Sequence, residues 1–263
     1  LRQMPDHLRN RATLQVFYVG FNHASGPFRE NPLLRLAVMH AIDREFIVRV
    51  LQAGKDTLAN GVIPPGMLGH DESRPGWSKD PRRAAELLAQ AGYPGGAGLP
   101  ELVYISNDTE GFRNLADRLV TDLAAVGIKA RISMSDLGAF IAALAPDAGT
   151  PPSADLFRMS YYADWPDPDN FLGLQFTGGM TDNFGEYANP AFDDLILLGR
   201  RESDPALRES LYREAESILL ADAALVPIYW YGEDLLVRPE LENVQLSPLG
   251  HFAIAWDEVS FRR

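Results

Sequence analysis

The chain alternates between short apolar runs and longer stretches in which apolar residues recur at helical spacing. Residues 14–21, LQVFYVGF, form a continuous apolar and aromatic run before the turn-prone segment NHASGP, which predicts a buried strand. Residues 31–54 begin with Asn31 before a proline, place apolar side chains at helical spacing and end at Gly54, which predicts one helix.

The middle of the chain continues this order. A helix is predicted after Asp80, where a proline again opens the segment, and residues 101–106, ELVYIS, are predicted to form a strand. A further helix is predicted from residue 110 up to Gly127, and it leads directly into another strand. This succession of strands and helices predicts a layered α/β domain.

The remaining residues follow the pattern with less regularity. They predict a short helix at 137–145, a polar loop at 146–155, a strand at 155–163, and two helices that start at Asn189 and Asp204, each before a proline. Residues 224–239 predict a pair of strands joined by a glycine turn, and residues 243–261 predict a further extended segment.

Charge and cysteine content exclude several classes of protein. Acidic residues outnumber basic ones 36 to 24, so the formal charge is −12, and a field of this sign repels nucleic acid and anionic lipid. The absence of cysteine excludes zinc ribbons, thiol nucleophiles and disulfides. No apolar run reaches the roughly 18 residues of a membrane span, and we expect neither a span nor an export signal within these residues.

Motifs for cofactors, metals and nucleophilic catalysis are not found. The segment PGGAGLP, residues 94–100, lacks the Lys-Ser/Thr of a nucleotide loop and precedes a strand instead of a helix. No Gly-x-Ser-x-Gly motif is present. The histidines are scattered without metal-ligand spacing, at positions 7, 23, 40, 70 and 251. We therefore expect no cofactor and no bound metal.

The segment YYADWPDPDNF, residues 161–171, combines three aspartates with aromatic residues and prolines. Its acids suggest either the paired carboxylates of a glycosidase or a calcium loop. The calcium pattern fails because the required glycine and distal glutamate are not at the expected spacing. Asp167 and Asp169 are interpreted as turn residues, with Asp169 as the cap of the helix NFLGLQF.

Asp164 differs from the other two acids of this segment. It directly follows the predicted strand and is flanked by Tyr161, Tyr162 and Trp165. An acid among aromatic side chains is unfavourable unless a cation meets it. The position therefore predicts that Asp164 binds a cationic group.

Seven segments of the chain occur together in one family of receptors, in the same order. They are VGFN…PLLRLAVMHAIDREFIV, VIPPGMLG, DPRRAAELLAQAGY, LADRLVTDLAAVGIKARI, YYADWPDPDNF, NFGEYANPAFDDLI and LYREAESILLADAALVPIYW. With these segments the chain resembles the family 5 solute-binding proteins, the peptide and nickel class of extracytoplasmic receptors that deliver ligands to ABC importers.

The resemblance implies the mixed-sheet α/β lobe of a type II, peptide-class periplasmic-binding-protein fold. Such receptors are similar to a two-lobed clamp of roughly twice this length. Residues 1–235 then correspond to the second, C-terminal ligand-binding lobe, and residues 236–263 to a segment that returns towards the first lobe. The first lobe, the export signal and a lipid-attachment cysteine would lie upstream of Leu1.

The resemblance also implies ligand-binding residues. In peptide-binding members the aspartate after this strand anchors the peptide α-amino group by a charge-assisted hydrogen bond, and Asp164 occupies that position. Tyr161 stands in place of the usual tryptophan as an aromatic wall, and the ligand backbone is expected to pair with the strand edge at 159–162. Arg158 matches a position that binds a ligand carboxylate in some oligopeptide receptors.

Strand geometry constrains these assignments. Side chains alternate along a strand, so Arg158 and Tyr162 share one face while Tyr161 lies on the other. Arg158 and Tyr161 are therefore not expected to point together into one cleft. Tyr162, beside Asp164, is predicted as a fourth ligand-binding residue.

The function implied by the resemblance is that of a substrate-binding component without enzymatic activity. It would bind a peptide or related small solute between two lobes and deliver it to an ABC permease, as an extracytoplasmic monomer, either periplasmic or a cell-surface lipoprotein. Two alternatives remain open: a carboxylate-dependent hydrolase that uses Asp164 and Asp167, and an interaction module whose acidic surface docks another protein.

Overall fold

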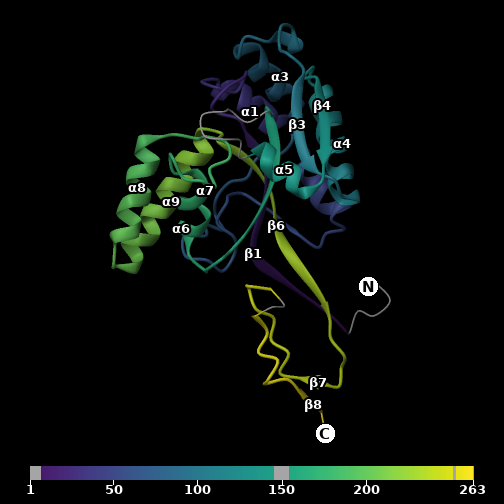
Figure 1. Cartoon of the computed structure of the whole chain (residues 1–263), viewed down its shortest axis with the longest axis vertical. Coiled ribbons are helices and arrows are strands. Elements are labelled where there is room, and N and C mark those ends of the chain that lie inside the picture. The colour runs from purple at the N-terminus through teal and green to yellow at the C-terminus, as the bar shows by residue number, and fades with distance from the viewer. Residues whose placement is uncertain (1–6, 145–153, 251–252, 263) are drawn as a thin grey trace.

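The computed structural model describes residues 7–144, 154–250 and 253–262, and its centre is one six-stranded mixed sheet (Figure 1). The strand order is β2-β6-β1-β5-β3-β4. Strands β5, β3 and β4 are parallel, whereas β1 is antiparallel to both β5 and β6. The strands are β1 (Leu8–Phe21), β2 (Thr57–Leu58), β3 (Leu102–Asn107), β4 (Ala130–Ser135), β5 (Leu156–Tyr162) and β6 (Leu225–Leu236). The predicted α/β fold with a mixed sheet is confirmed.

Helices cover both faces of this sheet. They are α1 (Pro32–Ala41), α2 (Arg44–Phe46), the π-helical turn η2 (Ile47–Leu51), α3 (Pro81–Gln90), the 3₁₀ turn η3 (Pro94–Gly96), α4 (Glu110–Ala124), α5 (Leu137–Leu144), α6 (Pro168–Phe171), α7 (Gly173–Phe176), α8 (Pro190–Arg201) and α9 (Pro205–Ala221). The predicted start signals of α1, α3, α8 and α9 are confirmed by side chains that accept first-turn N–H groups, those of Asn31, Asp80, Asn189 and Asp204. Most of the predicted loop at 146–155 lies outside the described residues.

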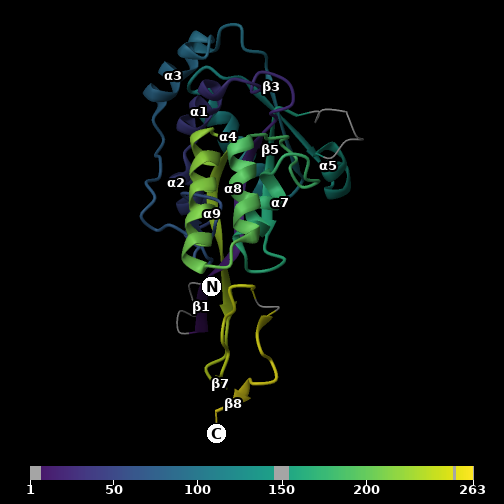
Figure 2. The same ribbon diagram turned by 90° about the vertical axis from the view of Figure 1, so that its left-hand side faces the viewer.

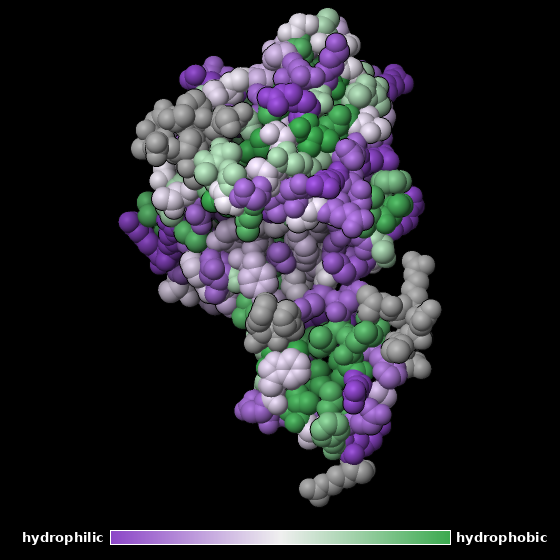
Figure 3. All heavy atoms as spheres, turned by 45° about the vertical axis from the view of Figure 1, so that its right-hand side comes forward, coloured by the Kyte–Doolittle hydropathy of each residue, from purple (hydrophilic) through white to green (hydrophobic). Residues whose placement is uncertain are grey.

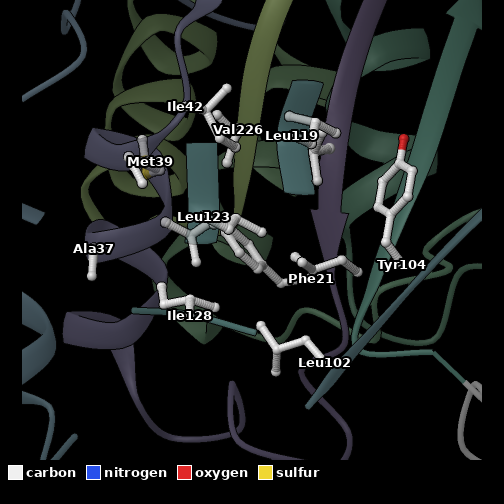
Figure 4. Packing of buried hydrophobic residues seen from close by; sticks show 14 of the residues in the cluster. Phe21, Ala37, Met39, Ile42, Leu102, Tyr104, Leu119, Leu123, Ile128 and Val226 are labelled. Atoms are coloured by element: carbon white, nitrogen blue, oxygen red, sulfur yellow. The ribbon is translucent and has the colours of Figure 1, made fainter. Parts of the chain in front are cut away.

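Two hydrophobic cores lie on the two faces of the sheet, and β1 contributes to both. Phe17, Val19 and Phe21 join the core formed with α1, α3 and α4, part of which Figure 4 shows. Val16 and Tyr18 point the other way, into the core formed with α8 and α9. Because successive side chains of a strand alternate between faces, β1 is apolar at nearly every position of its inner half.

The predicted helix over 31–54 is interrupted. Helix α1 ends at Ala41, and Ile42 adopts an extended conformation with φ −75° and ψ 128°. Asp43 then acts as a new cap, since its side chain accepts the Phe46 N–H while its own N–H donates to Asp122 Oδ2 at 2.9 Å. The prediction of one helix was wrong because a carboxylate distant in sequence takes the N–H that would continue α1.

The predicted strand pair over 224–239 is instead the single strand β6, and Gly232 lies within it. The Gly232 N–H donates to the buried Asp56 Oδ1 at 2.8 Å, and a Cβ at this position would collide with the carbonyl oxygen of Lys55. The glycine therefore permits a close approach of residues 55–56 and makes no turn.

Strands β1 and β6 carry the chain beyond the two cores. Residues 8–12 pair with residues 232–236, and this ribbon leads away from the helices to a small sheet of β7 (Leu241–Glu242) and β8 (Ser260–Phe261) (Figures 1 and 2). The segment 243–261, predicted as extended, contributes only β8, and residues 251–252 lie outside the described residues. The domain division at residue 235 stays a prediction.

His23 lies in the turn after β1 and is enclosed by side chains. Its ring contacts Phe21 and Tyr187 edge to face, and its Nε2 lies 2.9 Å from the carbonyl oxygen of Ala224. Burial lowers the pKa of His23 to about 4, from an ordinary value of 6.5, and the charge of Arg35 acts in the same direction. The folded state therefore favours the neutral imidazole.

We expect His23 to make stability depend on pH. Its contribution is complete above pH 6.5, where both states hold it neutral, and is lost as the pH falls towards 4, because only the unfolded chain binds the proton readily. The predicted loss is about 3 kcal/mol. Urea unfolding of wild type and His23→Gln across this range measures it, and the variant should show a flatter profile. The same profile in both proteins would contradict the prediction.

Candidate functional site

Strand β5 is paired along its full length on only one of its two edges. It pairs antiparallel with β1 from Leu156 to Tyr162, but its parallel pairing with β3 is confined to Leu156 and Phe157. From Arg158 onward, no strand among the described residues pairs with the edge that faces away from β1. The acidic segment 163–169 follows directly at the carboxyl end of this open edge.

The structure brings Tyr161 and Asp164 together. The Tyr161 hydroxyl donates to Asp164 Oδ2 at 3.3 Å, and its ring packs edge to face on Phe171 with centroids 5.5 Å apart. Burial, followed by the charge of Asp164, raises the pKa of Tyr161, so the phenol stays protonated and able to donate. Asp164 itself is exposed to solvent.

Asn170 completes this cluster, and sequence reasoning missed it. Its Oδ1 accepts the Asp164 N–H at 2.9 Å, and its Nδ2 lies 3.3 Å from Asp164 Oδ2 and 3.2 Å from the Tyr161 hydroxyl. The only sequence signal is a polar residue directly before an apolar helical stretch, and such residues are common at helix starts.

The other two aspartates of the segment are neutralised by arginines from the α8–α9 hairpin. Asp167 forms a two-bond ion pair with Arg208, both N···O distances being 2.9 Å. Asp169 pairs with Arg200 at 2.7 Å. Asp164 has no ion pair with any described residue, so it is the acid of this segment that remains available to a cation.

The cap of α6 is Asp167, not Asp169 as predicted. The Asp167 side chain accepts the Asp169 N–H at 2.9 Å, and Pro168 occupies the first helical position. The proline decides the assignment, because the residue before it is kept out of the helical conformation and so becomes the N-cap. The turn interpretation of both acids agrees with these contacts.

Arg158 lies on the opposite side of β5 from Tyr161, as strand alternation requires. Its side chain is buried, with its guanidinium 4.5 Å and 4.7 Å from the ring centroids of Phe112 and Phe140. No described residue hydrogen-bonds or ion-pairs with it, and its Nε is buried without a partner. Burial lowers the pKa of Arg158. The structure thus presents a buried cation between two phenylalanine rings.

Tyr162 is not part of the Asp164 cluster in the structure. Its hydroxyl donates to the carbonyl oxygen of Leu249, and it lies next to Gly250. Leu14 fixes the same segment, because its N–H donates to the Pro248 carbonyl at 2.8 Å. Tyr162 therefore contacts the segment that follows β6.

Within the described ranges no group of three or more His, Asp or Glu side chains is arranged to hold a metal ion. No helix of the described chain is both long and apolar enough to cross a bilayer. The arrangement suits non-covalent recognition: an open strand edge, an unneutralised carboxylate and an aromatic wall.

The family follows from a match over most of the chain. Residues 2–183 match the model of bacterial extracellular solute-binding proteins, family 5 Middle. The chain belongs to this family. It is 30% identical over 241 residues to the probable di/tripeptide-binding protein 5 of Pseudomonas aeruginosa, covering 89% of this chain and 44% of that protein. It is 28% identical over 244 residues to the periplasmic oligopeptide-binding protein OppA of Escherichia coli, covering 90% and 44%.

Solved structures show the same fold. HbpA2 from Haemophilus parasuis matches with a TM-score of 0.89 and 23% identity, over 100% of this chain and 52% of that one. DppA from Helicobacter pylori in complex with the peptide STSA matches with a TM-score of 0.83 and 25% identity, over 100% and 50%. The chain spans about half the length of the relatives it matches.

Asp167→Ala should lower stability. The variant loses the α6 cap and the ion pair to Arg208, so we expect a free energy of unfolding about 1–3 kcal/mol lower. Urea unfolding of the chain measures it. Asp194→Ala is the matched control, because Asp194 is exposed and makes no ion pair with a described residue. Equal stability of the two variants would contradict the structural role of Asp167.

Proposed function

We propose that this chain is the second lobe of a substrate-binding component of an ABC importer, which recognises peptides or related solutes by a free α-amino group. Membership of the family supports a binding role, and relatives named as di/tripeptide- and oligopeptide-binding proteins support the ligand class. Delivery to a permease and a location outside the cytoplasm, free or lipid-anchored, belong to the same proposal. The protein would act as a monomer and perform no covalent chemistry.

The observation that carries the proposal is the uncompensated charge of Asp164. Two of the three acids in the segment have arginine partners, whereas Asp164 lies exposed beside the Tyr161 ring at the end of the open β5 edge. An α-ammonium group would form a charge-assisted hydrogen bond with this carboxylate. The ligand backbone would continue along the unpaired strand edge, as peptides do when they add to a sheet.

We propose that Arg158 makes a second contact with the ligand, by binding one of its carboxylates. A buried guanidinium without hydrogen-bond acceptors is costly, and an entering carboxylate would supply them. Arg158 lies on the opposite side of β5 from Tyr161, so a ligand that also contacts Asp164 would reach it around the open edge, where the pairing between β3 and β5 ends. Phe112 and Phe140 would hold the planar guanidinium in position.

The half-length match supports a second lobe elsewhere in the protein. We propose that residues 236–263 contact that lobe. Large apolar side chains are exposed on or beside this segment, among them Leu236, Trp256 and Phe261, and Figure 3 shows hydrophobic residues gathered on this part of the surface. An apolar surface of this kind indicates an interface. Tyr162, bound to Leu249, would then join the lobe to this segment.

The hydrolase alternative finds less support. It requires Asp164 and Asp167 as a pair of free carboxylates, but Asp167 caps α6 and is bound by both terminal nitrogens of Arg208. A carboxylate held in this way is not free to act as a general base.

Asp164→Asn should abolish most ligand binding by the full-length protein. Loss of one partner of an enclosed charge pair costs about 2–5 kcal/mol, or about 30- to 4000-fold in affinity. Equilibrium dialysis with a pool of Xaa-Ala-Ala tripeptides, quantified by mass spectrometry, measures it. Asp169→Asn is the control, since Arg200 engages that acid, and should change affinity less than about threefold. A similarly small change in Asp164→Asn would contradict the proposal.

Arg158→Met should distinguish peptides by their carboxyl end. Methionine keeps the packing between the two phenylalanines but removes the charge, so affinity for tripeptides with a free carboxylate should fall about tenfold or more. Affinity for the same peptides with an amidated end should be nearly unchanged. Dialysis of both peptide pools against wild type and variant is the measurement, and an equal loss for both pools would refute the carboxylate contact.

A further inference from the structure

The Asn170 side chain is completely buried next to Asp164, the residue proposed to bind the ligand ammonium group. Its exposed fraction is 0%, although an asparagine at a helix start is usually solvated. Its amide oxygen accepts the Asp164 backbone N–H at 2.9 Å, and its amide nitrogen contacts Asp164 Oδ2 at 3.3 Å. One neutral side chain therefore binds both the main chain and the carboxylate of the same residue.

Because of these contacts, the two carboxylate oxygens of Asp164 have different environments. Oδ2 receives the Asn170 amide and the Tyr161 hydroxyl, each at 3.3 Å. Oδ1 accepts no hydrogen bond from any described residue, and the residue as a whole is exposed. One oxygen is thus fixed towards the protein while the other is left for an external donor.

The charge of the donor at this position is as important as its geometry. An arginine or lysine would orient Asp164 equally well but would neutralise it, as Arg208 and Arg200 neutralise the two acids that follow. The amide of Asn170 is neutral, so the carboxylate keeps its full attraction for a ligand cation.

The helix that carries Asn170 is itself immobilised. Asp167 ties the start of α6 to Arg208, Asp169 ties it to Arg200, and Phe171 is fully buried in the core. A fixed donor lowers the entropy lost when the carboxylate is ordered around a ligand.

We propose that Asn170 is a positioning residue that presents Asp164 Oδ1 to the ammonium group of the ligand and so sets the preference for a free α-amino end. The inference rests on the proposed function. It assigns Asn170 a role in specificity, in addition to its contribution to the packing of α6.

The test compares peptides that differ only in the amino group. Asn170→Ala in the full-length protein should lower affinity for the Xaa-Ala-Ala pool about 10- to 100-fold, because hydrogen bonds to charged groups are worth about 1.5–3 kcal/mol. Affinity for the N-acetylated pool should stay within about twofold of wild type. Asn183→Ala is the matched control, a buried asparagine that bonds Thr177 and Tyr187 and does not touch Asp164. It should affect both pools alike.

A double-mutant cycle measures the coupling between Asn170 and Asp164. In an Asp164→Asn background, Asn170→Ala should change affinity for the free-amino pool less than about twofold. Asn170→Ser replaces the alanine variant if that variant does not fold, since it keeps a small neutral polar side chain but is too short to hold both the N–H and Oδ2 of Asp164; the same selective loss is expected.

Two results would overturn the inference: an equal loss of both pools, or full additivity with Asp164→Asn. If Asp164→Asn alone changes nothing, or wild type retains no peptide, the proposed function fails and the inference fails with it. The Asp164→Asn single variant therefore distinguishes failure of the proposed function from failure of the Asn170 inference alone.

Discussion

The early end of the pairing between β3 and β5 is the constraint on which the rest of the site depends. β1 supports β5 along its whole length, so the strand stays ordered after β3 has left it. The sheet is consequently open at the carboxyl ends of its parallel strands, which is where open α/β sheets bind ligands. Tyr161 and Asp164 lie at this opening on one side, and Arg158 lies beside it on the other.

Ion pairs neutralise two of the three aspartates in the acidic segment and leave Asp164 as the uncompensated one. The arginines come from α8 and α9, 31 and 41 residues after their partners in sequence, and the same hairpin packs in the second core. Folding of that hairpin therefore fixes the acidic segment and cancels two of its charges. A segment that looks uniformly acidic becomes a single carboxylate on a rigid support.

Buried arginines elsewhere in the structure show how unusual Arg158 is. Arg35 donates to the carbonyl oxygens of Phe28, Asp222 and Ala223. Arg44 donates to those of Ala59, Pro227 and Trp77. The terminal nitrogens of both arginines thus donate to backbone acceptors, as buried cations generally must, although the Nε of Arg44 is buried without a partner. Arg158 contacts two aromatic rings and has no acceptor among the described residues.

The sequence by itself determined the α/β class, the caps of α1, α3, α8 and α9, and the opposite orientation of Tyr161 and Arg158 on their strand, because these follow from local periodicity and cap chemistry. It also singled out Asp164 by its place after a strand. Only the tertiary structure decided that α1 stops at Ala41, that Gly232 lies within a strand and that Asn170 holds Asp164. Each of these depends on a contact between residues that local patterns do not relate: Asp122 with Asp43, Asp56 with Gly232, and the fold of α6 back onto the loop before it.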